Sequence, residues 1–346
     1  APMLGLNGLV VKTHGSSKSK EIKNSILQCI AFKEQNISEK IKQQNLLTLP
    51  NGKLRYKLTN DYMFRAVFQK NPNALKGLLC ALLSLPKDSI KEVTILNPII
   101  LGETIDEKTC VLDLHIRLNN DEFINIEMQV TDWGDWPERS ITYLCRSFDQ
   151  LHRGESYADI HTTIHIGIVD FNLAHLTPEF YSEFKLMNVE NHEIYSDKFV
   201  LRVLNLNVLE DDSIAKEPAD LYYWARLFKA TTWEELKMLA KQNLDIEDAV
   251  VTLHELSDDE QIKLQCEARE RYERDMASAV AKGKAEGKRE GEKIGLRKGK
   301  EIGLHEGESK ILQLIQHLTA EGQTELISKV TTDSSYREEL YKKYNL

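Results

Sequence analysis

Two neighbouring runs of alternating apolar and polar residues, 110–118 and 123–130, constrain the fold of this 346-residue chain most strongly. Alternation with a period of two is typical of β-strands with one buried face. Residues 119–122 between the runs, with the sequence Asn-Asn-Asp-Glu, have turn chemistry, so we predict an antiparallel hairpin. Its buried face holds eight apolar side chains: Leu112, Leu114, Ile116, Leu118, Ile124, Ile126, Met128 and Val130.

The same alternation brings two acidic residues to the opposite face. The two apolar rows lie on the same side of the hairpin only if the residue numbers of each directly opposite pair have an even sum. The same condition places Asp113, Glu127 and Gln129 together on the other side. A five-residue connection would place Asp113 opposite Glu127. A three-residue connection would place it opposite Gln129, with Glu127 diagonal to it. In either register the two carboxylates share a face.

Adjacent carboxylates raise each other's pKa unless a cation lies between them. Hard oxygen ligands suit Mg²⁺ or Mn²⁺, and such an ion polarises a phosphodiester and lowers the pKa of a bound water. We therefore predict that Asp113 and Glu127 bind a metal ion. The plainer alternative is an exposed strand face that carries solvated charge.

The charge of the chain is acidic overall but unevenly distributed. The net charge is −9, from 45 basic and 54 acidic residues, which argues against a protein that coats nucleic acid by bulk charge. Residues 53–76 nevertheless carry six basic residues and one acid, whereas residues 102–138 carry ten acids and two basic residues. The basic run is a candidate phosphate-facing surface, although part of it belongs to a helix.

Several classes of protein lack their usual signals in this sequence. No run of about 18 apolar residues is present for a membrane span, and the N-terminal region has no secretory leader. The five cysteines are far apart and form no CxxC pair, against a disulfide framework or a cysteine zinc site. P-loop, GxGxxG, HExxH and GxSxG motifs are missing too. We predict a soluble cytoplasmic protein that does not associate with membranes.

Helices and strands alternate around the hairpin. Thr59 and Asn60 are both good N-caps for a first helix, Asn71 caps a second, and Pro86 stops the second. A helix after the hairpin, followed by another strand, predicts a mixed α/β sheet. The predicted elements outside the hairpin are a helix from 59 or 60, a helix over 72–85, a strand over 91–96, a helix over 136–151 and a strand over 161–170.

Beyond about residue 175 the pattern is mostly helical, with capping boxes that start at Thr232 and Ser257. The second leads into seven glycines, one every fourth residue from Gly283 to Gly307, among Lys, Arg and Glu. Each glycine inside a helix costs about 1 kcal/mol relative to alanine. The tract is therefore either a helix that packs closely on a second chain in a homodimer or a flexible charged linker. The amphipathic segment 311–318 then docks locally or pairs with a partner.

Several short motifs, in this order and spacing, resemble a known family. They are Leu58-Thr59-Asn60-Asp61-Tyr62-Met63-Phe64, Val67-Phe68, Leu112-Asp113, Ile126-Glu127-Met128-Gln129, Arg139, Tyr143 and Gly154-Glu155-Ser156-Tyr157. The set resembles the Rpn family of recombination-promoting nucleases and transposases, which belongs to the PD-(D/E)XK nuclease superfamily. The resemblance is best over residues 57–172. It implies a restriction-endonuclease-like α/β core, in which helices flank a mixed central sheet, with a helical C-terminal extension.

The resemblance also implies roles for individual residues. Asp113 and Glu127 take the places of the two superfamily acids, and Gln129 stands where most superfamily members have lysine. A neutral amide can orient a water or a phosphate but brings no positive charge. Asp61 is implied as an additional catalytic acid, with an ordinary acid at a helix N-terminus as the alternative. Arg139 is implied to contact a phosphate, with an ordinary helix-surface arginine as the plainer alternative. Arg65 and Lys57, from the basic run at 53–76, are the other candidates for substrate binding.

Together these inferences predict a divalent-metal-dependent DNA endonuclease, with Mg²⁺ or Mn²⁺ as cofactor, that promotes recombination or transposon-related mobility. The alternative is a catalytically weak or inactive nuclease-derived module that binds DNA or protein and assembles through its glycine-repeat helix. The predicted organisation is an N-terminal lead-in (1–52), a nuclease-like core (53–210), a helical subdomain (211–256), a long charged helix (257–310) and a C-terminal helical segment (311–346).

Overall fold

The computed structural model describes residues 2–3, 10–34, 46, 48–97, 99–100, 110–119, 121–151 and 154–346. The chain divides into two compact units, Ala1–Glu270 and Arg271–Leu346. The finer boundaries at residues 52, 210, 256 and 310 stay predictions. Within the described ranges, every helix is too short or too polar to cross a lipid bilayer.

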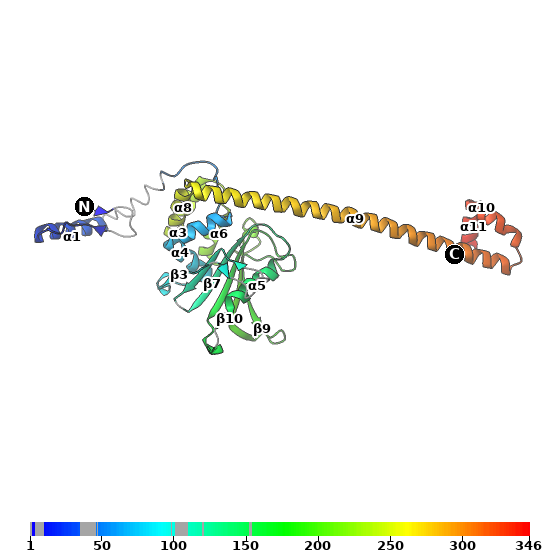
Figure 1. The fold of residues 1–346 in the computed structure, drawn as a ribbon, viewed down its shortest axis with the longest axis horizontal. Helices are drawn as coiled ribbons and strands as arrows, with labels where there is room; N and C mark the ends of the chain where they lie inside the picture. The colour runs from blue at the N-terminus through cyan, green and yellow to red at the C-terminus, as the bar shows by residue number, and fades with distance from the viewer. Residues whose placement is uncertain are drawn as a thin grey trace. The chain divides into compact units, whose positions relative to one another are not determined.

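A six-stranded mixed sheet forms the centre of the first unit and confirms the predicted α/β class (Figure 1). Its strand order is β3-β6-β7-β8-β10-β9, in which β7, β8 and β10 run parallel and the other neighbours are antiparallel. The strands are β3 (Val93–Ile95), β6 (Leu114–Leu118), β7 (Glu122–Gln129), β8 (Thr162–Val169), β9 (Tyr181–Met187) and β10 (Ile194–Asn205). Two short antiparallel pairs lie outside it: β1 (Pro2–Met3) with β2 (Val10–Val11), and β4 (Ile99–Ile100) with β5 (Cys110–Val111).

The hairpin β6–β7 has the predicted parity, but the predicted link between register and connection length was wrong. Leu114 pairs with Ile126 and Leu118 with Glu122, which leaves a connection of residues 119–121. This register, continued by one residue, places Asp113 opposite Glu127, the arrangement predicted for a longer connection. The difference arises because the strands pair as far as Leu118, closer to the turn than expected. Asn120 of the predicted turn lies outside the described residues.

Helices cover one face of the sheet and bury the apolar row of the hairpin. Asn60 caps the first helix by accepting a hydrogen bond from the backbone N–H of Met63, and Asn71 caps the second, which has Pro72 in its first turn. The start at Asn71 is thereby confirmed, and of the two caps predicted for the first helix the structure uses Asn60 and not Thr59. This layer consists of α3 (Asp61–Lys70), α4 (Pro72–Leu83), α6 (Ala219–Lys229), α7 (Trp233–Ala240) and α8 (Leu244–Ser257). One further helix, α1 (Ser19–Glu34), has no buried residue.

Helix α5 (Trp136–Phe148) covers the other face and begins where the sequence predicts. Trp136 packs there with Val169 of β8 and Val203 of β10. The polar row of β7 is consequently buried as well, and Glu127 is only 2% exposed. The alternative of an exposed, solvated strand face was therefore wrong, because alternation cannot reveal a second covering layer.

Two predictions for the later part of the first unit were wrong. Residues 181–205 form β9 and β10 instead of helices, because β9 is a half-exposed edge strand and the β9–β10 register shifts near Ser196, so neither strand alternates clearly. Ser257 does not begin a helix. It ends α8, and Asp259 caps the next helix by accepting hydrogen bonds from the backbone N–H groups of Gln261 and Ile262. The capping box at Thr232 is confirmed.

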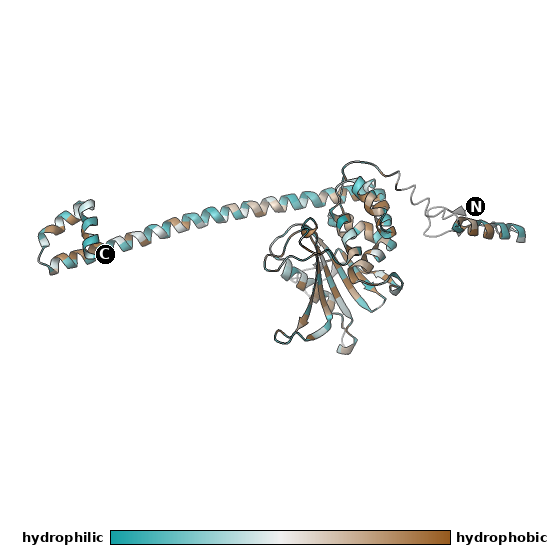
Figure 2. Cartoon of the chain, turned by 180° about the vertical axis from the view of Figure 1, so that it is seen from behind, coloured by the Kyte–Doolittle hydropathy of each residue, from teal (hydrophilic) through white to brown (hydrophobic). Residues whose placement is uncertain are grey.

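The glycine tract lies inside α9 (Glu260–Ala320), a helix of 61 residues that is largely hydrophilic (Figure 2). From Arg271 onwards this helix belongs to the second unit, together with α10 (Ile327–Thr332) and α11 (Ser334–Tyr344). Leu314, Leu318, Val330 and Leu340 form a small core there. This core confirms that segment 311–318 docks locally.

The glycines of α9 make no close contact within the described chain, since a Cβ built on any of the seven meets no atom within 4 Å. We therefore expect Gly291→Ala to stabilise the helix by about 0.5–1 kcal/mol. Hydrogen exchange over residues 285–300, followed by mass spectrometry, should become slower. Faster exchange in the alanine variant would contradict this expectation and favour the predicted homodimer, in which a second backbone needs the space.

Candidate active site

Two reciprocal hydrogen bonds hold Asp113 and Glu127 face to face. The backbone N–H of Asp113 donates to Oε1 of Glu127 at 2.9 Å, and the backbone N–H of Met128 donates to Oδ2 of Asp113 at 2.9 Å. Asp113 lies in the break between β5 and β6, which releases its N–H from the strand ladder. The two bonds use Oδ2 of Asp113 and Oε1 of Glu127, whereas Oε2 of Glu127 lies 3.8 Å from Nη2 of Arg139.

Burial shapes the electrostatics of this pair. The residues are 9% and 2% exposed. Loss of water and the neighbouring Asp61 carboxylate raise the pKa of Asp113 to about 7. Burial and the charge of Asp113 raise the pKa of Glu127 well above its ordinary value. A cation would reverse both effects, because it favours the ionised form of each acid.

Asp61 brings a third carboxylate to the pair from the first turn of α3. Its Oδ2 forms an ion pair with Nε of Arg269 at 2.7 Å. Its Oδ1 is buried and has no hydrogen-bond partner in the described part of the chain. A buried acceptor without a partner is costly, so this oxygen is suited to a donor or cation that arrives with a ligand.

A cavity of about 430 Å³ joins these acids to three arginines. One arginine comes from α3, one from α5 and one from α9. Guanidinium groups bind phosphate oxygens through paired hydrogen bonds, whereas carboxylates bind hard cations, so the cavity suits a phosphate and a cation together. The lining residues are Asp61, Tyr62, Arg65, Asp113, Glu127, Met128, Arg139, Tyr143, Gln265, Ala268 and Arg269.

The structure brings together five of the seven residues that the sequence singles out. Asp113, Glu127, Asp61, Arg139 and Arg65 line the cavity. The other two, Lys57 and Gln129, do not line it: Lys57 is exposed, and Gln129 is buried behind the wall. The roles of all seven stay predictions.

Sequence reasoning missed the contribution of α9, whose first turns supply Gln265 and Arg269. These turns are tied to the start of the core: Glu267 accepts hydrogen bonds from Arg55 Nη2 at 2.8 Å and from the Tyr56 hydroxyl at 3.0 Å. Asn60 Nδ2 donates to the backbone carbonyl of Cys266 at 3.4 Å. No local pattern indicates contacts between residues about 200 positions apart, and nothing in the sequence distinguishes Arg269 from the other charged residues of this helix.

The acidic residues of the cavity fit a hard divalent cation that is held by Asp113 and Glu127. Over the described ranges, no group of three or more His, Cys, Asp or Glu side chains is placed to hold a metal ion, and Asp61 is engaged by Arg269. Mg²⁺, however, ordinarily takes one or two carboxylates and completes its shell with waters and substrate phosphates. Asp113 and Glu127 meet that requirement, with Oε2 of Glu127 shared between the cation and the Arg139 guanidinium 3.8 Å away.

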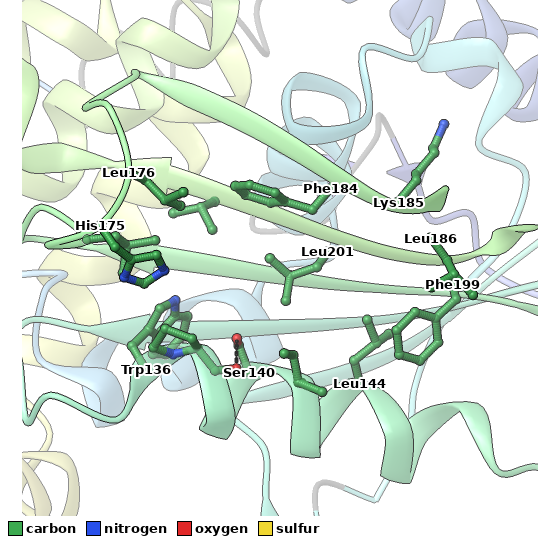
Figure 3. A pocket seen from close by; sticks show the side chains of 14 residues that line it. Trp136, Ser140, Leu144, His175, Leu176, Phe184, Lys185, Leu186, Phe199 and Leu201 are labelled. Carbon is green, nitrogen blue, oxygen red and sulfur yellow. Dashed lines mark hydrogen bonds between the residues drawn. The ribbon is translucent and has the colours of Figure 1, made fainter. Parts of the chain in front are cut away.

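A second cavity, of about 360 Å³, has a different character (Figure 3). It lies between α5 and the strands β9 and β10, and its walls are mainly apolar, with Leu144, Phe199 and Leu201 among them. None of its lining residues is acidic. It therefore offers no ligands for a hard cation, and the acidic cavity is the candidate active site.

Comparison with known proteins gives one extensive family match and short matches to curated proteins. A family model described as "PD-(D/E)XK nuclease family transposase" matches residues 58–283. Two short matches are to proteins named phosphate acyltransferase. One, from Campylobacter concisus, is 50% identical over 44 residues, 13% of each chain. The other, from Clostridioides difficile, is 56% identical over 43 residues, 12% of this chain and 13% of that protein. The chain thus spans only 13% of the length of these curated relatives, and no solved structure matches it significantly.

The family match covers the part of the chain that builds the acidic cavity. Residues 58–283 contain the central sheet, Asp61, the Asp113–Glu127 pair, α5 and the first turns of α9. The match extends over more than half of the chain and agrees with the resemblance that the short motifs show. The chain therefore belongs to the PD-(D/E)XK nuclease family of transposases.

Proposed function

We propose that the protein is a divalent-metal-dependent DNA endonuclease that promotes recombination or transposon-related mobility. The observation that carries this proposal is the buried Asp113–Glu127 pair, fixed by two hydrogen bonds and open to a cavity that three arginines surround. Buried carboxylates that lie beside each other are stabilised in their ionised form by a cation, and guanidinium groups bind phosphate. A DNA backbone with Mg²⁺ or Mn²⁺ supplies both. We also propose that it works in the cytoplasm.

Each residue of the cavity, and Lys57 outside it, has a separate role in hydrolysis. In the reaction a water oxygen bonds to phosphorus, one ester P–O bond breaks, and a proton passes from the water to the leaving oxygen by way of solvent. Asp113 and Glu127 would hold the cation. Its positive charge would polarise the phosphodiester and lower the pKa of the attacking water. The unpartnered Oδ1 of Asp61 accepts a hydrogen bond from the attacking water. Arg65 binds a phosphate oxygen, and Lys57 contacts the DNA outside the cavity.

Plasmid nicking tests this function. The wild-type protein should convert supercoiled plasmid to open-circle or linear DNA with Mg²⁺ or Mn²⁺ and not with EDTA. Asp113→Ala should lower the rate by about a thousandfold, because it removes a cation ligand. Lys241→Ala, the control at an exposed position that does not line the cavity, should change the rate less than about threefold. Cleavage that persists in EDTA or in Asp113→Ala would overturn the proposal.

One observation favours a second candidate function, a nuclease-derived module that binds DNA without efficient cleavage. The lysine of most superfamily members is replaced by Gln129, which brings no charge and does not line the cavity. In that case the protein should retard DNA in a gel shift while nicking less than one plasmid per protein molecule. Multiple turnovers with dependence on Asp113 would exclude this candidate.

A further inference from the structure

The amide of Gln129 uses both of its ends inside the protein. Its Nε2 donates to the backbone carbonyl of Thr131 at 2.7 Å, and its Oε1 accepts a hydrogen bond from Nη1 of Arg139 at 2.9 Å. The residue is 7% exposed. Because the residue does not line the cavity, its remaining N–H and lone pair are not presented to a water or a phosphate there.

The group that Gln129 holds is the guanidinium of Arg139, which does reach the cavity. Its Nη2 lies 3.8 Å from Oε2 of Glu127. Its Cζ lies 5.3 Å from the centre of the Tyr143 ring, over the ring face. The amide, the carboxylate and the aromatic ring therefore fix this cation from three sides.

We propose that Arg139 is a catalytic residue that takes over the charge of the missing lysine, and that Gln129 is a positioning residue that aims it. This inference rests on the proposed nuclease function. The guanidinium stays protonated, so it stabilises negative charge on the phosphoryl oxygens without donating a proton. The positive charge is thus supplied by Arg139 on α5 instead of a lysine on β7, and the Gln129 amide on β7 holds the guanidinium in place.

The proposal predicts that loss of the Arg139 charge slows cleavage and that a lysine at position 129 restores part of the rate. Arg139→Ala should lower the single-turnover rate of plasmid cleavage in Mg²⁺ by about 100-fold, the loss typical of one preorganised donor. DNA affinity measured in EDTA should change less than about threefold. The double variant Gln129→Lys/Arg139→Ala should recover at least about tenfold of that loss, because lysine returns the charge to the strand. Added methylguanidinium should rescue Arg139→Ala in the same way.

Three controls make the result unambiguous. Arg146→Ala removes a cation of the same helix that does not line the cavity, so it should leave the rate unchanged. Gln129→Ala should slow cleavage about tenfold without rescue by methylguanidinium, since Arg139 is still present but badly aimed. Circular dichroism melts establish that each variant is folded, and Arg139→Gln replaces Arg139→Ala if alanine unfolds the protein.

The outcomes separate this inference from the function on which it rests. If Asp113→Ala abolishes cleavage while Arg139→Ala and Arg139→Gln cleave normally, the nuclease function stands and the role of Arg139 is refuted. If Arg139→Ala is impaired but neither Gln129→Lys nor methylguanidinium restores activity, the arginine is merely structural and the proposal fails. If the wild type itself does not cleave, the proposed function fails first, and Arg139 has no reaction to serve.

Discussion

Asp113→Asn is expected to abolish cleavage and at the same time to stabilise the metal-free protein. The amide keeps an oxygen that can accept the hydrogen bond from Met128, but it removes a charge that is buried beside Asp61 and Glu127. With the pKa of Asp113 raised to about 7 in the folded protein, ionisation opposes folding at pH 8. Relief of that opposition should add about 1–3 kcal/mol to the free energy of unfolding.

The sign of the effect depends on pH. The folded state holds the Asp113 proton more tightly than the unfolded chain does, so the wild-type protein loses stability as pH rises from about 4 to about 7. Urea unfolding in EDTA should therefore show a large advantage for Asp113→Asn at pH 8 and almost none at pH 4. Mg²⁺ should raise the melting temperature of the wild type and not that of the variant.

A matched control comes from an acid that is well paired. Lys229 Nζ lies 2.7 Å from one carboxylate oxygen of Asp170 and 2.9 Å from the other, so Asp170→Asn should destabilise the protein at pH 8. If Asp113→Asn also destabilises the metal-free protein at pH 8, the Asp113–Glu127 pair is not strained by its charge, and relief of that strain cannot be what favours cation binding.

The part of the site that lies on neighbouring strands could be predicted from the sequence. Alternation in the two runs fixes which side chains share a face, and parity alone brings Asp113 and Glu127 together. The length of the connection could not be obtained in this way. It depends on whether pairing continues to Leu118, and the turn residues allow several lengths.

The parts of the site that come from distant elements were beyond local reasoning. The burial of Glu127 depends on α5 packing over β7 and β8, and the position of Arg269 depends on Glu267 meeting Arg55 and Tyr56. Sequence periodicity reports only what one element presents, not what covers it. For the same reason the half-exposed β9 cannot be recognised as a strand: its single edge pairing leaves little apolar alternation in the sequence.

Gly167→Ala is expected to damage both stability and activity, although Gly167 does not line the active-site cavity. The residue lies on β8 opposite Glu127, and a Cβ built on it would come within 2.1 Å of Cζ2 of Trp136. Trp136 opens α5 and is 3% exposed, so it cannot move away without shifting the helix. Overpacking of this kind costs about 1–3 kcal/mol. Gly283→Ala, whose new Cβ meets nothing within 4 Å, is the control and should not destabilise the fold.

The loss of activity should follow from the movement of α5. Arg139 lies one turn beyond Trp136, and a shift of about 1 Å at its guanidinium is enough to slow a reaction about 100-fold. The smaller ring in the double variant Gly167→Ala/Trp136→Phe should relieve the crowding. Its losses of stability, measured by urea unfolding, and of plasmid cleavage rate should therefore be smaller than the sum of the losses in the two single variants. Phenylalanine sacrifices no hydrogen bond, because the indole N–H of Trp136 has no partner within the described chain. Strictly additive losses would show that Trp136 and Gly167 act independently, and that the close approach of α5 to β8 does not set the position of Arg139.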